Sequence, residues 1–371
     1  MSIAEKELII SANNVTIAEN EQKIASQIKM AYDLEKSLSK DFTDYSYFFY
    51  NSNRGGGLVT EGEISLPLHT KNATNFEGMF YNNTGVTSIP WFDTSNGTNF
   101  KKMFYMCKSI KEIPPIDLSK ATDVSYLCYS CTSLTNDGIR MLEFPNATNV
   151  GYMFTDTPIT TIPLFDTHNL ENFNYFLYSC KSLTTVPALD MSNATSTKYM
   201  FGYCEKLKYI PPLDLSNVVD GSYMFYGCTT QFINPTNNKI ELLLTSTAKM
   251  ENMSYMFYNS KIYIVKGLDF SSVSNQSNVS SMFSGCSSLK ELEISGVIKV
   301  PLSFSNCSNL SKETAKNIIN ALVDYSTDTT NAYKYKITFA SAVKTALNNE
   351  GATSPNGNTW LEYAYDKGWN T

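Results

Sequence analysis

Cysteine and aspartate recur at regular intervals along the 371-residue sequence. Thiolates and carboxylates bind metal ions, and thiols also form disulfides or act as nucleophiles. Each of these functions needs a few such residues at one place, whereas a repeat places the same residue type along its whole length. The repeat must therefore be defined before any of these residues is given a role.

The repeat has a step of 24 residues in most copies. A complete copy contains M-F-x-x-C, then I-P-x-L-D-x-S-N, then a polar stretch that ends in tyrosine. The copies begin at Met79, Met103, Leu127, Met153, Phe176, Met200, Met224, Met256 and Met282, and a degenerate last copy begins at Ser303.

Each copy is predicted to contain one extended arm and one short helix. In the arm, apolar residues fall at every third position, as at Ile110, Ile113 and Ile116, and a proline fixes a bend. The S-N-A-T phrase offers helix-capping side chains, and the Y-M-F-x-x-C phrase places Met, Phe and Cys on one helical face. Because such a unit cannot bury its apolar face alone, neighbouring units must cover it. We therefore predict an α/β repeat, a solenoid of about ten 24-residue units over residues 79–310.

The two ends of the chain differ from the repeats. Residues 1–45 are predicted to form a helical docking or oligomerisation segment, because four apolar residues recur there every seven positions. Residues 46–78 are interpreted as a glycine-rich hinge and a decayed first repeat. Residues 311–371 are predicted to form an α/β cap, with helices at "LSKETAKNIINALVDY" and "SAVKTALNNEG" and a strand at "YKYKITF". The stretch Gln231 to Lys249 lengthens one unit to 32 residues and is expected to bulge.

Seven of the eight cysteines occupy one column of the repeat. These are Cys107, Cys131, Cys180, Cys204, Cys228, Cys286 and Cys307. Units without cysteine carry Asn83, Thr157 or Ser260 there, so we interpret the column as a structural ladder of buried thiols selected for small size. Disulfides between neighbouring units remain the alternative, because strands about 4.7–5 Å apart permit them. A zinc site is not expected, because Cys128 and Cys131 form the single C-x-x-C pair.

An acidic residue ends the arm in most units. The aspartates are Asp93, Asp117, Asp166, Asp190, Asp214 and Asp269. Aspartate followed by Ser or Thr and Asn is typical of a side chain that hydrogen-bonds its own turn. A calcium-binding ladder is the alternative, but the G-G-x-G-x-D pattern of calcium-loaded repeats is absent from the sequence. The N-x-S/T triplets at Asn146 and Asn193 belong to the same corner, so they are weak evidence for glycosylation.

Tyrosine is unusually frequent, with 24 residues, and its positions in the repeat are informative. Half of them fall in two columns, one before the Met-Phe pair and one after it. The columns indicate either an aromatic ladder that holds units together or a surface on which sugar rings stack. A third, variable set lies between the apolar positions of the arms and is predicted to form a ligand-binding face: Trp91, Lys111, Glu112, Leu164, Lys208, Tyr209, Tyr263 and Lys266.

Composition argues against several classes of protein. The net charge of -6 comes without a basic run, so nucleic acid is not an expected partner. No stretch of about 18 uncharged apolar residues occurs, so membrane insertion is not expected. Only two histidines are present, and the acidic residues are dispersed along the repeats rather than paired at one place as glycoside hydrolysis requires. We therefore expect no enzyme activity, no cofactor and no metal site.

The phrases M-F-x-x-C, S-L-x-x-I-P-x-L-D and S-N-A-T resemble the BspA-like branch of leucine-rich repeats over residues 76–310. That resemblance implies a right-handed solenoid used in adhesion, and many such proteins are exported to bacterial surfaces. The phrase "VTIAENEQKI" and the region from Leu310 to "KGWNT" are similar to repeat proteins found among tail and baseplate genes of phages and prophages of Gram-positive bacteria. Phage structural proteins need no export signal, and none is visible at the start of this sequence.

The resemblance implies a non-catalytic phage tail or baseplate protein that binds the host cell surface. Its expected partners are other tail or baseplate proteins, bound through residues 1–45, and a host envelope glycan or surface protein; a homo-oligomer is compatible with this assembly. Its expected location is the virion, after synthesis in the bacterial cytoplasm. A bacterial surface adhesin and a purely structural tail component are the alternatives, and an enzyme acting on wall polysaccharide is the least favoured.

Overall fold

The computed structural model describes residues 43–51, 59–60, 63–64, 70–328 and 335–371. The chain divides into an N-terminal unit, residues 1–146, and a C-terminal unit, residues 147–371. The repeat continues across this point in the sequence, which gives no signal of a boundary there. The predicted docking helix, up to residue 42, and the glycine-rich hinge at Asn53 to Gly57 lie outside the described residues.

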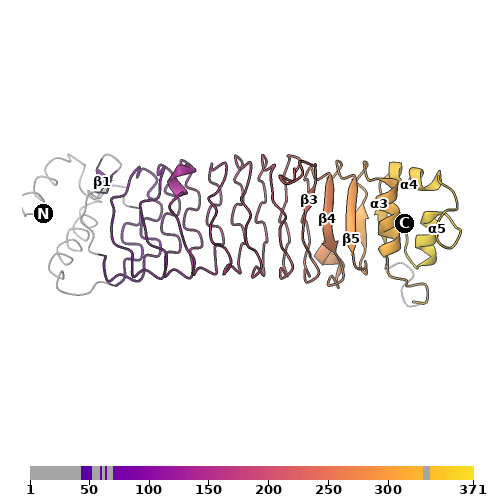
Figure 1. Cartoon of the computed structure of the whole chain (residues 1–371), viewed down its shortest axis with the longest axis horizontal. Coiled ribbons are helices and arrows are strands. Elements are labelled where there is room, and N and C mark those ends of the chain that lie inside the picture. Colours follow the sequence, from indigo (N-terminus) through magenta and orange to yellow (C-terminus); the bar gives the residue numbers. More distant parts are fainter. Residues whose placement is uncertain (1–42, 52–58, 61–62, 65–69, 329–334) are drawn as a thin grey trace, which may run out of the picture. The chain divides into compact units, whose positions relative to one another are not determined.

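Within each unit, successive coils of the chain lie side by side (Figure 1). One coil contains an arm and a turn segment, which is the run of turns that ends at the cysteine column, such as residues 99–107 and 196–204. Parallel bridges join the starts of successive turn segments from Asp44 to Asp123 in the N-terminal unit and from Asn149 to Asn252 in the C-terminal unit, for example Asn75 to Asn99 and Ser196 to Asp220. The turn segment of the predicted decayed repeat is also formed, because Tyr45 and Phe49 donate backbone hydrogen bonds to Asn75 and Met79.

Backbone hydrogen bonds alternate along most of the turn segments, as residues 199–204 show. The N–H groups of Tyr199, Phe201 and Tyr203 donate to carbonyls of the next coil, at N···O distances of 3.0, 2.9 and 2.6 Å. The N–H groups between and after them, from Met200, Gly202 and Cys204, donate to carbonyls three residues earlier in the same coil. Every second peptide therefore bonds to the neighbouring coil, and the intervening peptides close turns.

The predicted short helix is absent from these turn segments, and the sequence prediction was wrong on this point. The residue before the Met-Phe pair has a positive φ, for example +55° at Tyr199 and +60° at Tyr223, and so does the residue before the cysteine, such as Tyr203 at +58°. A right-handed helix requires negative φ at consecutive residues. Two left-handed residues four positions apart therefore interrupt helical winding. The left-handed conformation costs each bulky residue about 1–2 kcal/mol of conformational energy.

The strands and short 3-10 helices are few. The N-terminal unit contains the antiparallel pair β1 (Val59–Thr60) and β2 (Glu63–Ile64) and the 3-10 helix η2 (Asp137–Ile139). In the C-terminal unit, β3 (Leu242–Leu243), β4 (Ile264–Asp269) and β5 (Glu291–Ser295) form a parallel sheet in the order β3-β4-β5. The same unit contains η3 (Gln276–Val279) and the parallel pair β6 (Leu302–Phe304) and β7 (Ile337–Phe339).

Phenylalanine forms the centre of the core. In the N-terminal unit, the rings of Phe80 and Phe104 stack 5.6 Å apart. In the C-terminal unit, buried rings stack from coil to coil and into the last strand: Phe201, Phe225, Phe257, Phe283, Phe304 and Phe339. Full burial of each side chain contributes about 1.5–3 kcal/mol, so the column joins the coils to the C-terminal segment.

The C-terminal segment contains the predicted helices and strand. Helix α3 (Lys312–Ala321) begins after Ser311, whose side chain accepts from the N–H of Thr314, and α4 (Ser341–Asn348) and β7 follow the predicted pattern. Helix α5 (Trp360–Asp366) was not predicted. Its signal was present as a capping box, in which Thr359 and Glu362 bond each other's backbone N–H groups.

Candidate functional site

The eight residues of the predicted ligand-binding face belong to both units. Trp91, Lys111 and Glu112 lie in the N-terminal unit and are exposed, with Trp91 at 70%. The backbone at Lys111 is held, because its carbonyl accepts from the N–H and the hydroxyl of Thr135, both at 3.0 Å. Lys111 and Glu112 therefore extend from a fixed arm, and Trp91 lies on the arm of the preceding coil.

The other five residues lie on arms of the C-terminal unit. Leu164 is 75% exposed, and Tyr209 is bridged to the neighbouring arms through Thr185 and Ile233. The Lys208 ammonium lies 5.1 Å from the centroid of the Tyr209 ring. The Tyr263 ring, on a later arm, has the Lys290 ammonium at 5.6 Å.

Lysine and tyrosine therefore recur together on these arms. We name Lys208, Tyr209, Tyr263, Lys266 and Lys290 the arm cluster. Its side chains are half-buried or exposed, and each ring is paired with a cation, an interaction worth about 0.5–1 kcal/mol at exposed sites. Lys290 was not in the predicted set, although its position in the repeat, next to a buried leucine, is the one that Lys208 occupies.

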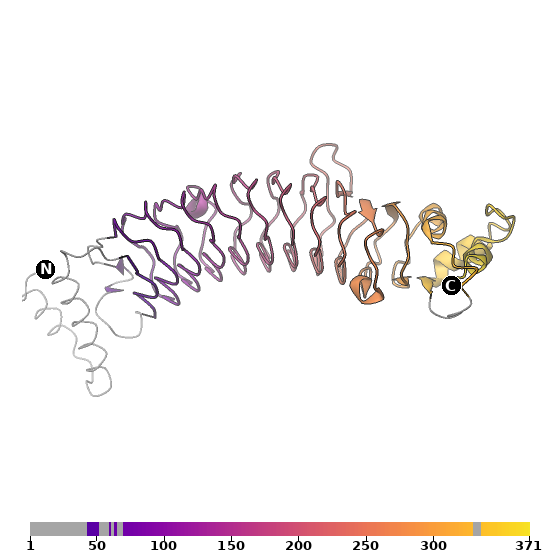
Figure 2. The same cartoon turned by 90° about the horizontal axis from the view of Figure 1, so that it is seen from below.

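The predicted bulge lies among these arms. Its residues 235–240 are exposed, and Figure 2 shows a loop that projects from the neighbouring coils at this point. The bulge returns to the sheet through β3, in which Leu243 pairs with Lys266 of β4. The insert therefore borders the arm cluster.

Glu241 anchors the insert. Its side chain is buried, and Oε1 accepts from the amides of Asn234 at 3.0 Å and Asn237 at 2.5 Å. Oε2 lies 3.2 Å from the Lys266 ammonium. The hydrogen bond from Asn237, with those from Asn234 and Lys266, holds the pKa of Glu241 below its usual value despite burial. This anchor was not recognised in the sequence, because only the fold brings Lys266, from a later coil, to the Glu241 carboxylate.

The tyrosine columns form stacked ladders. In the C-terminal unit the ring centroids of Tyr152 and Tyr175, of Tyr175 and Tyr199, and of Tyr199 and Tyr223 lie 4.2, 4.6 and 4.2 Å apart, with nearly parallel planes. Tyr81 and Tyr105 stack in the same way in the N-terminal unit. Because the ring faces cover one another, a sugar ring cannot stack on the face between two neighbours. The geometry favours the structural interpretation of these columns.

The cysteine column is a row of buried free thiols. Each Sγ lies 2.9–3.7 Å from a backbone carbonyl of the preceding coil, as at Cys204 and Leu177. Asn83 makes the same contact through its amide, 2.6 Å from the Phe49 carbonyl. Small size alone is therefore an incomplete account of the column, since Asn, Thr and Ser are also hydrogen-bond donors.

The corner prediction for aspartate is confirmed. Each of the six carboxylates accepts from the N–H two residues later, at 2.8–3.3 Å. The amide of the asparagine three residues after the acidic residue donates to a carbonyl of the previous coil, as Asn193 does to His168 and as Asn146, which follows Glu143, does to Ser119. These side chains therefore stabilise the corner and the contact between coils.

In the described part of the chain, no group of three or more His, Cys, Asp or Glu side chains could hold a metal ion. His168 pairs with the exposed Asp166, at 2.7 Å from Nδ1 to Oδ1, within one corner. Among the helices described, none has the length and apolar character needed to cross a membrane.

Replacing Cys204 tests the role of the donor. Thr and Val have similar volumes, but only Thr keeps a donor, as Thr157 does elsewhere in the column. We expect Cys204→Val to lower the free energy of unfolding by about 1 kcal/mol more than Cys204→Thr in urea titrations. Phe201→Ala, at a buried ring of the core column, should cost about 3–5 kcal/mol. Equal stability of the Val and Thr variants would mean that the column requires only size.

Glu241 should make the insert sensitive to acid. A carboxyl group with a lowered pKa adds stability that is present above its unfolded pKa and lost as the pH falls through its folded pKa. Glu241→Gln should therefore destabilise the protein by about 1–2 kcal/mol at neutral pH, from the lost ion pair and hydrogen bond. At about pH 3.5 the difference from the wild type should shrink. Urea titrations at both pH values measure this, with the exposed Glu251→Gln as control; a difference independent of pH would contradict the anchor.

The sequence matches one family model in four overlapping regions, residues 43–161, 157–238, 176–297 and 232–348. The family is described as "Mycoplasma protein of unknown function, DUF285". Comparison with curated proteins and with solved structures gave no match. The four regions together span residues 43–348, which is more than half of the chain, and their overlap reflects the internal repeat. The chain therefore belongs to the DUF285 family and is a repeat protein.

Proposed function

We propose that the chain is a non-catalytic recognition protein that binds a cell-envelope glycan or surface protein through the arm cluster and the insert. The observation that supports this most is the pairing of lysine and tyrosine on arms of the same unit, at Lys208 with Tyr209 and at Lys290 with Tyr263. Tyrosine provides a rigid apolar surface with a polar end, and lysine attracts anionic groups such as wall phosphates. The Glu241 anchor supports this role, since a fixed loop loses little entropy on binding.

We also propose that the stacked coils form a right-handed leucine-rich-repeat-like solenoid of about ten units. The support is the parallel bridging of equivalent residues one repeat apart, as from Asn172 to Ser196 and on to Asp220. In such an array, stability comes from contacts between neighbouring units, so exposed arm residues are free to vary. This is the physical basis for assigning recognition to the arms.

The biological setting that we propose is a phage tail or baseplate. The sequence resemblance of the N-terminal phrase and the C-terminal region supports it, with residues 1–45 as the contact to other tail proteins and the virion as the location. A bacterial surface adhesin is the second candidate, because the family description names a bacterial genus. Immunogold labelling of phage particles and of the bacteria that encode the protein distinguishes the two. If the tails are labelled only after they have been disrupted, the protein is buried inside them, and a purely structural role would be favoured.

Binding of the full-length protein to Gram-positive cells and to their isolated walls tests the recognition role. We expect saturable binding, and at least about tenfold weaker affinity for the double variant Tyr209→Ala, Tyr263→Ala, because aromatic anchors contribute most to interfaces. The melting temperature should be nearly unchanged, since both side chains are partly exposed.

Tyr50→Ala is the matched control, because Tyr50 is 51% exposed and lies outside the arm cluster. Walls stripped of phosphate polymers by hydrofluoric acid show whether the lysines contact phosphate. Unchanged binding of the double variant would exclude the arm cluster, and no saturable binding by the wild type would exclude the recognition role on these cells.

A further inference from the structure

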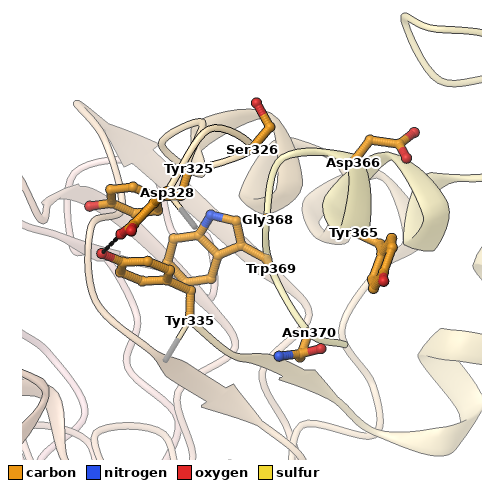
Figure 3. Close-up of a pocket in the computed structure, with 9 residues that line it drawn as sticks. All are labelled: Tyr325, Ser326, Asp328, Tyr335, Tyr365, Asp366, Gly368, Trp369 and Asn370. Atoms are coloured by element: carbon orange, nitrogen blue, oxygen red, sulfur yellow. Dashed lines mark hydrogen bonds between the residues drawn. The ribbon is translucent and has the colours of Figure 1, made fainter. Parts of the chain in front are cut away.

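Stacked tyrosines of the C-terminal unit cover one another's ring faces at two places. Beside the pocket of about 290 Å³ in the C-terminal segment, Tyr325 and Tyr335 stack with ring centroids 3.8 Å apart, and Figure 3 shows them next to the buried Trp369 indole. The other place is the tyrosine ladder of the turn segments. This ladder ends at Tyr255 and Tyr258, and there the covering of ring faces stops.

The last two rings continue the stack from the preceding coil. The ring centroids of Tyr223 and Tyr255 lie 4.7 Å apart, those of Tyr226 and Tyr258 lie 4.9 Å apart, and both pairs have an interplanar angle of 5°. Within their own coil, Tyr255 and Tyr258 lie 5.6 Å apart at 48°. Among the described residues, no ring of the following coil contacts either of them.

The following coil is in register but has small residues where the ladder would continue. Tyr255 donates its backbone N–H to the Ser280 carbonyl at 2.9 Å, as each earlier tyrosine of this column in the C-terminal unit does to the next coil. Ser281 and Ser284 therefore occupy the positions of Tyr255 and Tyr258. The φ of Ser281 is +53°, close to the +55° of Tyr255, so the backbone of a further rung is formed without its rings.

The positions beside the last rings face solvent. Ser281 and Gly285 are exposed, and Ser284 is half-buried. A side chain from elsewhere that covered the outer ring faces would also bury these small residues. Tyr255 and Tyr258 are themselves half-buried, because the preceding coil covers their inner faces. We name the group Tyr255, Tyr258, Ser281 and Ser284 the ladder end.

The surroundings of the ladder end are polar but carry little charge. None of the residues 252–260, 278–286 and 302–307 is charged, and the two residues that flank the first of these ranges, Glu251 and Lys261, have opposite signs. The Ser284 hydroxyl donates to the amide oxygen of Asn306 at 3.3 Å. Two apolar ring faces therefore lie beside hydroxyl and amide groups, a combination that suits a neutral ligand with an apolar face and a polar edge.

We propose that the ladder end binds a neutral pyranose ring of a carbohydrate. The C–H face of the sugar lies on the outer faces of Tyr255 and Tyr258, in the position that the next tyrosines would occupy, and its hydroxyl groups reach the serine and asparagine side chains. An anionic ligand would meet no cation within these segments. A phenol ring would also complete the stack, but it would use few of the polar groups. The ladder end belongs to the turn segments, so it is separate from the arm cluster and does not depend on the proposed recognition role.

Saturation-transfer difference nuclear magnetic resonance on the full-length protein tests the site. Methyl β-D-glucopyranoside is the probe, because its equatorial hydroxyl groups leave C–H groups on both ring faces. Mannitol, an open-chain polyol without a ring face, is the control ligand. We expect saturable binding of the glucoside through its ring C–H protons and no saturable binding of mannitol.

Two variants of one serine separate the ring faces from the hydroxyl group. Ser284→Leu covers the outer face of Tyr258 with a branched side chain and should weaken glucoside binding at least about tenfold, whereas Ser284→Ala leaves the ring open and should weaken it less than about threefold. Tyr258→Ala removes one of the two faces and should weaken binding about threefold to tenfold. Circular dichroism shows that each variant is folded.

Three results would overturn the proposal. The first is the absence of saturable glucoside binding by the wild type, and the second is wild-type affinity in the folded Ser284→Leu and Tyr258→Ala variants. The third is saturable binding of p-cresol without binding of the glucoside, which would assign the ladder end to an aromatic side chain of a protein partner. The arm-cluster variant Tyr209→Ala, Tyr263→Ala should bind the glucoside like the wild type, so failure of one site is distinguished from failure of the other.

Discussion

The alternation of backbone hydrogen bonds in the turn segments is the interaction on which the rest of the molecule depends. Tyr199, Phe201 and Tyr203 donate to the next coil, while the residues between them close turns within their own coil. A right-handed helix would direct all its N–H groups along its own axis and leave none for the neighbour. The left-handed residues therefore make contact between coils possible, although tyrosine at positive φ is unfavourable by itself.

The side-chain columns follow from this backbone. Because equivalent residues of neighbouring coils are brought into register, phenylalanine stacks on phenylalanine inside and tyrosine on tyrosine at the edge. Each aromatic pair adds about 0.5–1.5 kcal/mol beyond burial, which offsets part of the strain at the left-handed tyrosines. The thiol of Cys204 adds a further hydrogen bond, to the Leu177 carbonyl. The turn side thus holds the coils together, and the arm side is left to vary.

The sequence predicted the period, the columns and the cap helices, because these depend on spacing and local capping signals. It failed at the turn segments, where the apolar spacing imitates a helix and bulky tyrosines occupy positions that favour glycine. A signal was nevertheless present before the cysteine column, where Asn82, Asn259, Gly227 and Gly285 have positive φ. The Glu241 anchor and the C-terminal pocket could not be predicted, because both join residues from separate parts of the chain; Tyr325 and Trp369 are an example.

Hydrogen–deuterium exchange, resolved to single residues or short fragments, tests the central claim that the turn segments hold the coils together. The account predicts that turn segments such as 99–107 and 196–204 exchange at least about tenfold more slowly than the arms that follow them, 108–117 and 205–214, because fewer arm N–H groups are hydrogen-bonded. Arms that exchange as slowly as the turn segments, or more slowly, would contradict it and would assign the contact between coils to the arms.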